Sequence, residues 1–124
     1  MREITLSRLG HTWILDLDGT IVRHNGYKTE HGETFLEGAA GFLKNIPEDD
    51  MIVFLTSRTD EQKEMTEEFL RQRGVRYDHI IYNAPYGERI IVNDRKPSGL
   101  QTAVAINVER DGICDLTIKV DETL

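Results

Sequence analysis

Short apolar runs alternate with stretches of helical spacing along this chain. The first run, at 13–17 (WILDL), is followed by Asp18-Gly19-Thr20 and has the form of a strand buried in a parallel sheet. The same reasoning predicts further strands over four later runs, and a last, alternating strand at the end of the chain: 51–55, 79–82, 89–92, 103–108 and 113–120.

Two helices are expected between these strands. The first has apolar residues spaced over one helical face within 39–46 and ends at Pro47. The second begins after Thr59, which forms a capping-box pattern with Gln62, and ends at Gly74, a residue suited to the left-handed turn after a helix.

Strands separated by helices predict an α/β fold with a single doubly wound, Rossmann-like, mostly parallel sheet. Asn25-Gly26 lies between two short extended runs and predicts a flap hairpin after the first strand. The intervals between Asp16, Thr56 and Asp94 are filled by this flap, one helix each and a short strand. We therefore expect one domain over 1–124, without a cap domain.

Composition narrows the class of partner. The chain has 124 residues and a net charge of -7, and an acidic protein binds nucleic acid or an anionic membrane poorly. Its one cysteine excludes an intrachain disulfide, and no apolar run approaches the roughly 20 residues of a membrane span. A cytoplasmic protein, with neither nucleic acid nor membrane as partner, is expected.

Polar residues follow the predicted strands at one edge of the sheet. The first strand ends in Asp16-x-Asp18, the second in Thr56-Ser57-Arg58 and the fourth in Asn93-Asp94. Ligands of doubly wound sheets bind outside these carboxyl ends. Carboxylates, hydroxyls and cations together suit a metal ion and a phosphate group.

These segments also carry a resemblance. DLDGT at 16–20, TSR at 56–58 and ND at 93–94 resemble motifs I, II and IV of the haloacid dehalogenase superfamily, in its phosphatase branch. The similarity spans about residues 12 to 108. Within the superfamily, the chain most resembles small capless bacterial members, some of which are linked to surface-polysaccharide synthesis.

The resemblance implies a Mg²⁺-dependent phosphomonoester hydrolase. Asp16 is expected to attack phosphorus and form an aspartyl-phosphate, and Asp18 to act as general acid and then general base. Mg²⁺ is expected to be bound by the Asp16 carboxylate, the Asp18 backbone carbonyl and Asp94. A small phosphorylated metabolite, such as a sugar phosphate, is the expected substrate.

Further residues of these motifs are expected to bind the phosphoryl group. Thr56 and the Ser57 amide contact its oxygens, while Gly19 and Thr20 form the tight turn after the nucleophile. Two cationic or titratable residues at the rim complete the candidate binding set, Arg58 and His24.

The lysine of motif III has no match in the usual place, because residues 74–93 contain none. Arg89 is cationic but starts the fourth predicted strand, at the wrong end of the sheet. Lys96 follows the correct end of that strand, and Lys63 begins the helix after motif II. We favour Lys96 as the catalytic lysine and keep Lys63 as the alternative.

Other functions remain open. A phosphotransferase would use the same Asp16 but would have to exclude water from the aspartyl-phosphate. A phosphate-ligand sensor would keep the fold without turnover, and the missing lysine is compatible with it. A receiver domain needs an acid at the end of the third strand, where the chain reads Ile81-Tyr82-Asn83. An open site could also be closed by a second subunit, so a homo-oligomer is possible.

Overall fold

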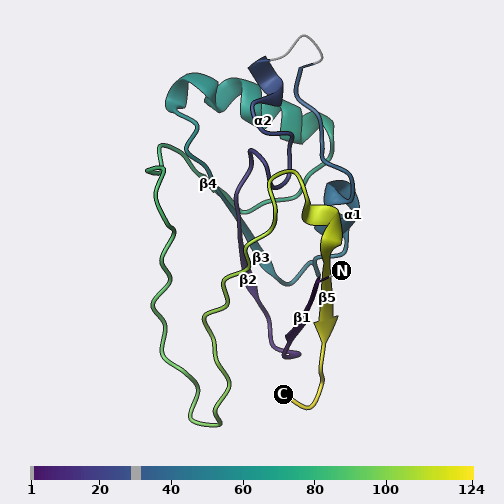
Figure 1. Cartoon of the computed structure of the whole chain (residues 1–124), viewed down its shortest axis with the longest axis vertical. Coiled ribbons are helices and arrows are strands. Elements are labelled where there is room, and N and C mark those ends of the chain that lie inside the picture. The colour runs from purple at the N-terminus through teal and green to yellow at the C-terminus, as the bar shows by residue number, and fades with distance from the viewer. Residues whose placement is uncertain (1, 29–31) are drawn as a thin grey trace.

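Two small parallel sheets form the framework of the computed structural model, which describes residues 2–28 and 32–124 (Figure 1). The larger sheet has the order β2–β3–β4, from Thr12–Leu15, Met51–Leu55 and His79–Ile81. In the smaller sheet, β1 (Arg2–Leu6) pairs with β5 (Leu116–Val120). The predicted α/β class with parallel strands is therefore confirmed.

The core lies on the larger sheet and on the turn that follows β2. Side chains on β3 alternate, so that Ile52 and Phe54 are buried between more exposed neighbours. The other members of the core come from β2 and the turn after it, from α1 and the residues just beyond it, from α2 and from the segment before β5: Leu15, Leu17, Ile21, Val22, Ala39, Leu43, Ile46, Leu70 and Ile113. Because the turn after β2 is itself part of the core, its backbone is held firmly.

The two helices form where the sequence predicts them. Helix α1 spans Ala39–Lys44, and α2 spans Lys63–Gln72 after a short 3-10 turn, η2 (Asp60–Gln62). The capping box between Thr59 and Gln62 is present, and Gly74 adopts a φ of 67°. Within the described part of the chain, no helix has the length and apolar character of a membrane span.

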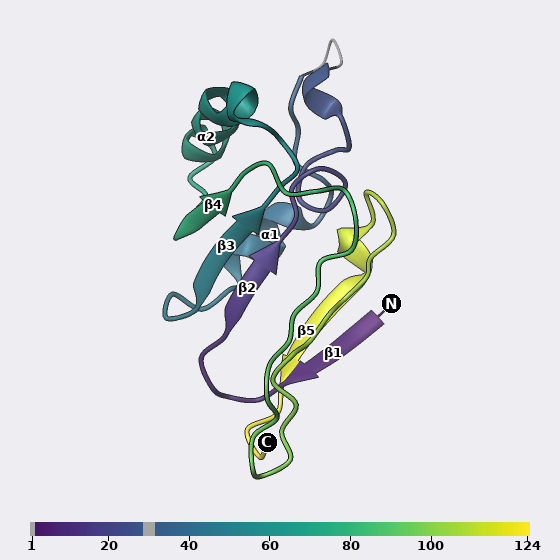
Figure 2. The same cartoon turned by 90° about the vertical axis from the view of Figure 1, so that its left-hand side faces the viewer.

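The predicted single sheet is wrong in three respects. The strands form two sheets, β1 was not predicted, and neither 89–92 nor 103–108 forms a strand. Instead, the chain between β4 and η3 (Ile113–Asp115) extends along one side of the molecule and turns back (Figure 2). Its apolar residues gain little from burial, since Ile90 and Val92 are 83% and 91% exposed.

The flap region also differs from a simple hairpin. Asn25 has the expected positive φ, 56°, but it leads into a 3-10 turn, η1 (Gly26–Lys28). The two sides of the region do pair at one position further from Asn25, where Val22 and Phe35 form an antiparallel bridge. Residues 29–31 of the expected hairpin lie outside the described residues.

Candidate functional site

The turn after β2 gathers its backbone around one carbonyl group. The carbonyl oxygen of Leu17 accepts hydrogen bonds from the backbone N–H groups of Thr20, Ile21 and Val22, at 3.1, 2.9 and 3.0 Å. Leu17 itself is 1% exposed and anchors the turn in the core. This arrangement fixes the backbone that carries Asp16 and Asp18 at the carboxyl end of β2.

Gly19 allows a second segment to approach this turn. It has a φ of 87°, and a Cβ atom there would lie 3.3 Å from Arg110 Cγ. The backbone N–H of Asp111 donates to the Gly19 carbonyl oxygen at 2.7 Å. The Asp111 carboxylate also accepts from the backbone N–H of His24 at 3.0 Å, so that the returning chain is joined to both sides of the turn.

The carboxylate of Asp16 is contacted by a cation and a hydroxyl. Arg89 Nη1 lies 3.0 Å from Asp16 Oδ1, and Thr20 Oγ1 donates to Oδ2 at 3.2 Å. The Arg89 Nη2 group reaches Ser57 Oγ at 3.5 Å. The expectation that Arg89 lies at the wrong end of the sheet is therefore incorrect, because 89–92 does not form the strand on which it depended.

Asp18 is contacted by a different arginine. Arg58 Nε and Nη2 donate to the two oxygens of Asp18, both at 2.9 Å. The opposite side of the guanidinium contacts Glu33, with Nη1 and Nη2 donating at 2.9 and 2.7 Å. A fifth hydrogen bond joins Nη1 to Thr66 Oγ1 at 2.8 Å.

Arg58 is thus a buried bridge rather than the rim residue expected from its place in the sequence. It is 6% exposed, and its five N–H donors are all used. Burial would lower the pKa of Arg58, but the hydrogen bonds that it donates to Asp18 and Glu33 raise this pKa above its ordinary value. The ring of Tyr27 lies 4.7 Å from the guanidinium carbon and completes its surroundings.

Thr56 and Ser57 follow β3 at the same end of the sheet. Thr56 is 1% exposed, and its hydroxyl oxygen accepts from the Arg58 backbone N–H at 3.1 Å. Ser57 is only half-buried, and its hydroxyl donates to the Pro85 carbonyl oxygen at 3.4 Å. Of the two hydroxyls, that of Ser57 is the more accessible to a ligand, while that of Thr56 shapes the backbone.

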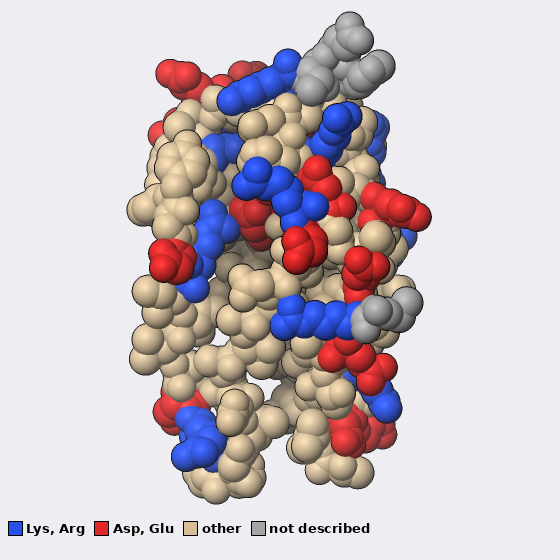
Figure 3. Space-filling model, in the orientation of Figure 1, with Lys and Arg blue, Asp and Glu red and all other residues tan. Residues whose placement is uncertain are grey.

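These groups line a large open cavity between the sheet and the extended segment. Its volume is about 1580 Å³, and Asp16, Asp18, Thr56 and Arg89 are all on its wall. Figure 3 shows charged side chains of both signs on the upper part of this face, and further charged side chains at the two sides of its lower part, around an uncharged middle. The charged upper part is the candidate site.

His24 and Lys96, the expected substrate-binding histidine and catalytic lysine, also line this cavity. Lys96 belongs to a turn of the extended segment, in which the Gly99 N–H donates to the Lys96 carbonyl oxygen at 2.8 Å. Lys63, the alternative lysine, is exposed at the start of α2 and is not on the cavity wall.

The structure does not bring the three predicted metal ligands together. Asp94 is exposed on the extended segment, and its backbone carbonyl accepts from Asn93 Nδ2 at 3.2 Å. Among the described residues, no three His, Cys, Asp or Glu side chains are grouped so as to bind a metal ion. In this arrangement the carboxylate oxygens of Asp16 are bonded to Arg89 and Thr20, and those of Asp18 to Arg58.

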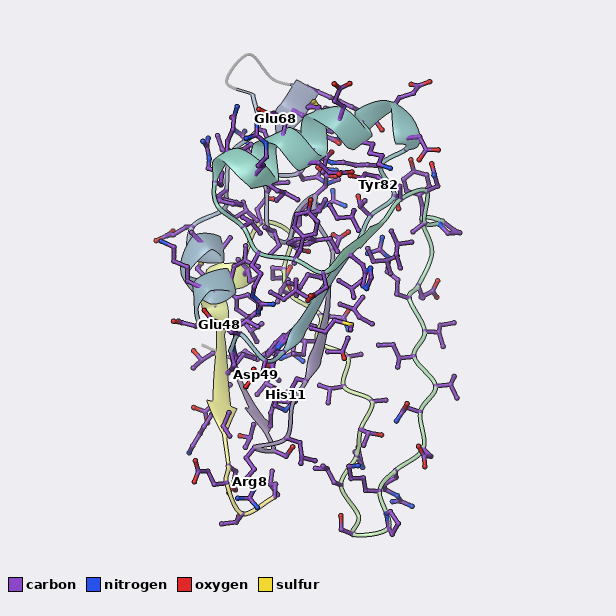
Figure 4. All side chains as sticks on the ribbon, turned by 180° about the vertical axis from the view of Figure 1, so that it is seen from behind. Arg8, His11, Glu48, Asp49, Glu68 and Tyr82 are labelled. Carbon is purple, nitrogen blue, oxygen red and sulfur yellow. The ribbon has the colours of Figure 1, made fainter. Side chains whose placement is uncertain are left out.

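His11 is separate from the site. In the view from behind, it lies near the turn that carries Asp49, whereas Tyr82 lies beside α2 toward the other end (Figure 4). The Nδ1 atom of His11 is 3.5 Å from Asp50 Oδ2. Asp50 also accepts from the Trp13 indole at 2.9 Å, so this pair fixes the start of β2.

Two residues of the site, Glu33 and Arg89, were not predicted as members. Glu33 is separated from Arg58 by 25 positions and carries no motif, so the sequence offers no signal for the pair. Arg89 is the one cation between 77 and 94, and that isolation beside an acidic motif is the signal that could have identified it.

Comparison of the chain with known protein families, with curated proteins and with solved structures found no match.

Proposed function

We propose that this protein hydrolyses phosphomonoesters through an aspartyl-phosphate on Asp16. The observation that carries the proposal is the meeting of Asp16 and Arg89 at 3.0 Å, with Ser57 Oγ 3.5 Å from the same guanidinium. A nucleophilic carboxylate and a cation that can bind phosphoryl oxygens are thereby adjacent.

In the first step, an Asp16 oxygen attacks phosphorus as the ester P–O bond breaks. Arg89 and the Ser57 hydroxyl bind phosphoryl oxygens, so that charge on the transferring group is neutralised. Asp18 gives a proton to the leaving oxygen. In the second step, Asp18 takes a proton from water, whose oxygen attacks phosphorus and releases Asp16 with inorganic phosphate.

Mg²⁺ stays part of the proposal on the sequence resemblance, with the Asp16 carboxylate, the Asp18 backbone carbonyl and Asp94 as ligands. Its support within the chain is the free edge of β2, which has a neighbouring strand on the β3 side alone among the described residues. Addition of 89–92 to this edge would give the larger sheet a fourth strand and move Asp94 toward the carboxyl end of β2. The exposed Ile90 and Val92 are suited to such pairing.

The substrate we favour is a small phosphorylated metabolite, and a sugar phosphate above others. His24, Asn25 and Tyr27 line the same cavity as Asp16 and offer polar and aromatic contacts to a sugar. The net charge of -7 disfavours nucleic acid. A cytoplasmic location, supported by the single cysteine, belongs to the same proposal.

The test is phosphate release from a panel of phosphomonoesters, with Mg²⁺ and with EDTA. Asp16→Asn removes the nucleophile, and Asp49→Asn, at an exposed position away from the cavity, is the matched control. Release by wild type and Asp49→Asn, lost in Asp16→Asn, is the expected result. Equal release by Asp16→Asn would contradict the aspartyl-phosphate.

A sensor without turnover is the second candidate. It is favoured by one observation, which is that both aspartates are already engaged by arginines in this structure. A sensor would bind phosphate or a phosphorylated sugar with Asp16→Asn unimpaired. Calorimetric binding without phosphate release would select it over the hydrolase.

A further inference from the structure

Arg58 connects three separate parts of the chain around one of the proposed reacting groups. Its guanidinium joins Asp18 in the turn after β2, Glu33 in the segment after η1 and Thr66 on α2. The side chains of this cluster are largely shielded from water: taken without their backbone, those of Arg58, Glu33 and Asp18 are 3%, 8% and 20% exposed. The contacts are therefore held in a region of low dielectric, where they are strong and directional.

The Asp18 and Glu33 carboxylates each form two hydrogen bonds with the guanidinium, whereas a simple ion pair has one contact. Each is bonded through both oxygens, which fixes the plane of the carboxylate as well as its distance. A carboxylate oxygen has two lone pairs, so Asp18 keeps a second one on each oxygen for a proton or a substrate.

We infer that Arg58, held from behind by Glu33, is a positioning residue that sets the orientation of Asp18 toward the leaving oxygen of the substrate. The inference rests on the proposed function, because it assigns Asp18 its role as proton donor. Glu33 acts indirectly, because it fixes Arg58 and not Asp18. The ring centre of Tyr27 lies 4.7 Å from the guanidinium carbon and covers one face of it. A misoriented acid lowers the rate of hydrolysis most for esters whose leaving oxygen must be protonated.

The inference is tested by comparing two classes of ester. p-Nitrophenyl phosphate releases a phenolate that leaves without a proton, whereas an alkyl phosphate from the active panel releases an alkoxide that requires one. The measured quantity is kcat/KM for each ester in wild type, Arg58→Gln, Arg58→Lys and Glu33→Gln. Arg71→Gln is the control, since Arg71 is exposed and pairs with Glu68 on α2, away from the cavity.

We expect Arg58→Gln to lower kcat/KM for the alkyl ester by roughly 100-fold, and for p-nitrophenyl phosphate by less than about tenfold. Glu33→Gln should give the same selectivity with a smaller loss, and Arg58→Lys should recover part of the alkyl activity. Arg71→Gln should match wild type on both esters. Circular dichroism and thermal melting identify variants that are folded.

Equal losses on both esters in a folded variant would overturn the positioning role and leave the hydrolase proposal standing. If Arg58→Gln does not fold, Glu33→Gln decides, because it leaves both Arg58 and Asp18 in place. Failure of wild type to hydrolyse either class of ester would overturn the proposed function and this inference with it, whereas hydrolysis of the aryl ester alone would overturn only the role of Asp18 as proton donor and hence this inference.

Discussion

The guanidinium of Arg89 lies 3.0 Å from the Asp16 carboxylate, although the two residues are 73 positions apart in the chain. Asp16 directly follows β2, while Arg89 comes from the extended segment after β4. A phosphate dianion would be repelled by a bare carboxylate, and this cation compensates part of that repulsion. The pair thus joins the proposed nucleophile to a cation suited to binding a phosphoryl group.

Removal of the Arg89 cation should weaken substrate binding. Arg89→Gln is expected to raise KM for phosphomonoesters by roughly 10-fold or more, since a charge-assisted hydrogen bond is lost. Arg89→Lys should be affected less because it keeps the charge. Steady-state kinetics measure both, and Arg8→Gln, exposed on the loop after β1, is the matched control. An unchanged KM in Arg89→Gln would contradict a role in binding.

Thr56 should contribute to stability as well as to the site. Thr56→Val removes the oxygen that accepts the Arg58 backbone N–H at 3.1 Å, and leaves that donor buried without its partner. The free energy of unfolding is expected to fall by about 1–3 kcal/mol, measured by urea denaturation. Thr56→Ser keeps the acceptor and should lose less. If the two variants are equally stable, the hydrogen bond is not the cause.

The Asp50 carboxylate should make folding sensitive to acid. Burial of Asp50 raises its pKa, but the hydrogen bonds from Trp13 and His11 outweigh this and lower the pKa below the ordinary value of 3.8. Its stabilisation is therefore complete above pH 3.8 and is lost as the pH falls through the lower, folded-state pKa.

The measurement is thermal unfolding of wild type and Asp50→Asn between pH 7 and pH 2. Wild type should be the more stable at pH 7, and the difference should shrink at the acid end of the range. Asp49→Asn, at the exposed neighbouring position, should follow wild type throughout. A stability difference that is independent of pH would contradict the assignment.

A proline in the extended segment would separate its two possible arrangements. In the present arrangement, the Ile91 N–H donates no hydrogen bond to any residue that the structure describes. Ile91→Pro should therefore alter the free energy of unfolding by less than about 0.5 kcal/mol. In a strand beside β2, the same change would remove a ladder hydrogen bond.

If 89–92 joins the sheet during turnover, Ile91→Pro should therefore lower phosphate release while the melting temperature stays the same. Ile91→Thr, which keeps the N–H and a β-branched side chain, is the control for loss of the apolar group. Full activity in a stable Ile91→Pro protein would rule out the added strand.

Local signals predicted the parts of the fold that depend on neighbours in sequence. The strand at Met51–Leu55 has the predicted bounds, and the capping box of Thr59 begins the second helix as expected. Pairing between distant segments was beyond such signals. Strand β1 depends on Leu116–Val120, and the run at 89–92 has strand composition but lacks a strand beside it.

In the candidate site too, residues placed by local signals were predicted, and residues placed by distant partners were not. Asp16, Asp18, Thr56 and Ser57 were identified because strand ends and short motifs place them, and all four line one cavity. The arginines were assigned wrongly because their partners are remote: the burial of Arg58 depends on Glu33, and the place of Arg89 depends on a segment without regular structure.

The pairing of β1 with β5 has a consequence for the order of events during synthesis. Arg2 aligns with Leu116 and Leu6 with Val120, so each rung of this ladder joins residues more than a hundred positions apart. While the ribosome is still adding the intervening chain, β1 has no partner, whereas β2 and β3 can already meet. The smaller sheet therefore closes last, and a ribosome stalled before residue 116 would hold a nascent chain whose first strand remains open to other edges.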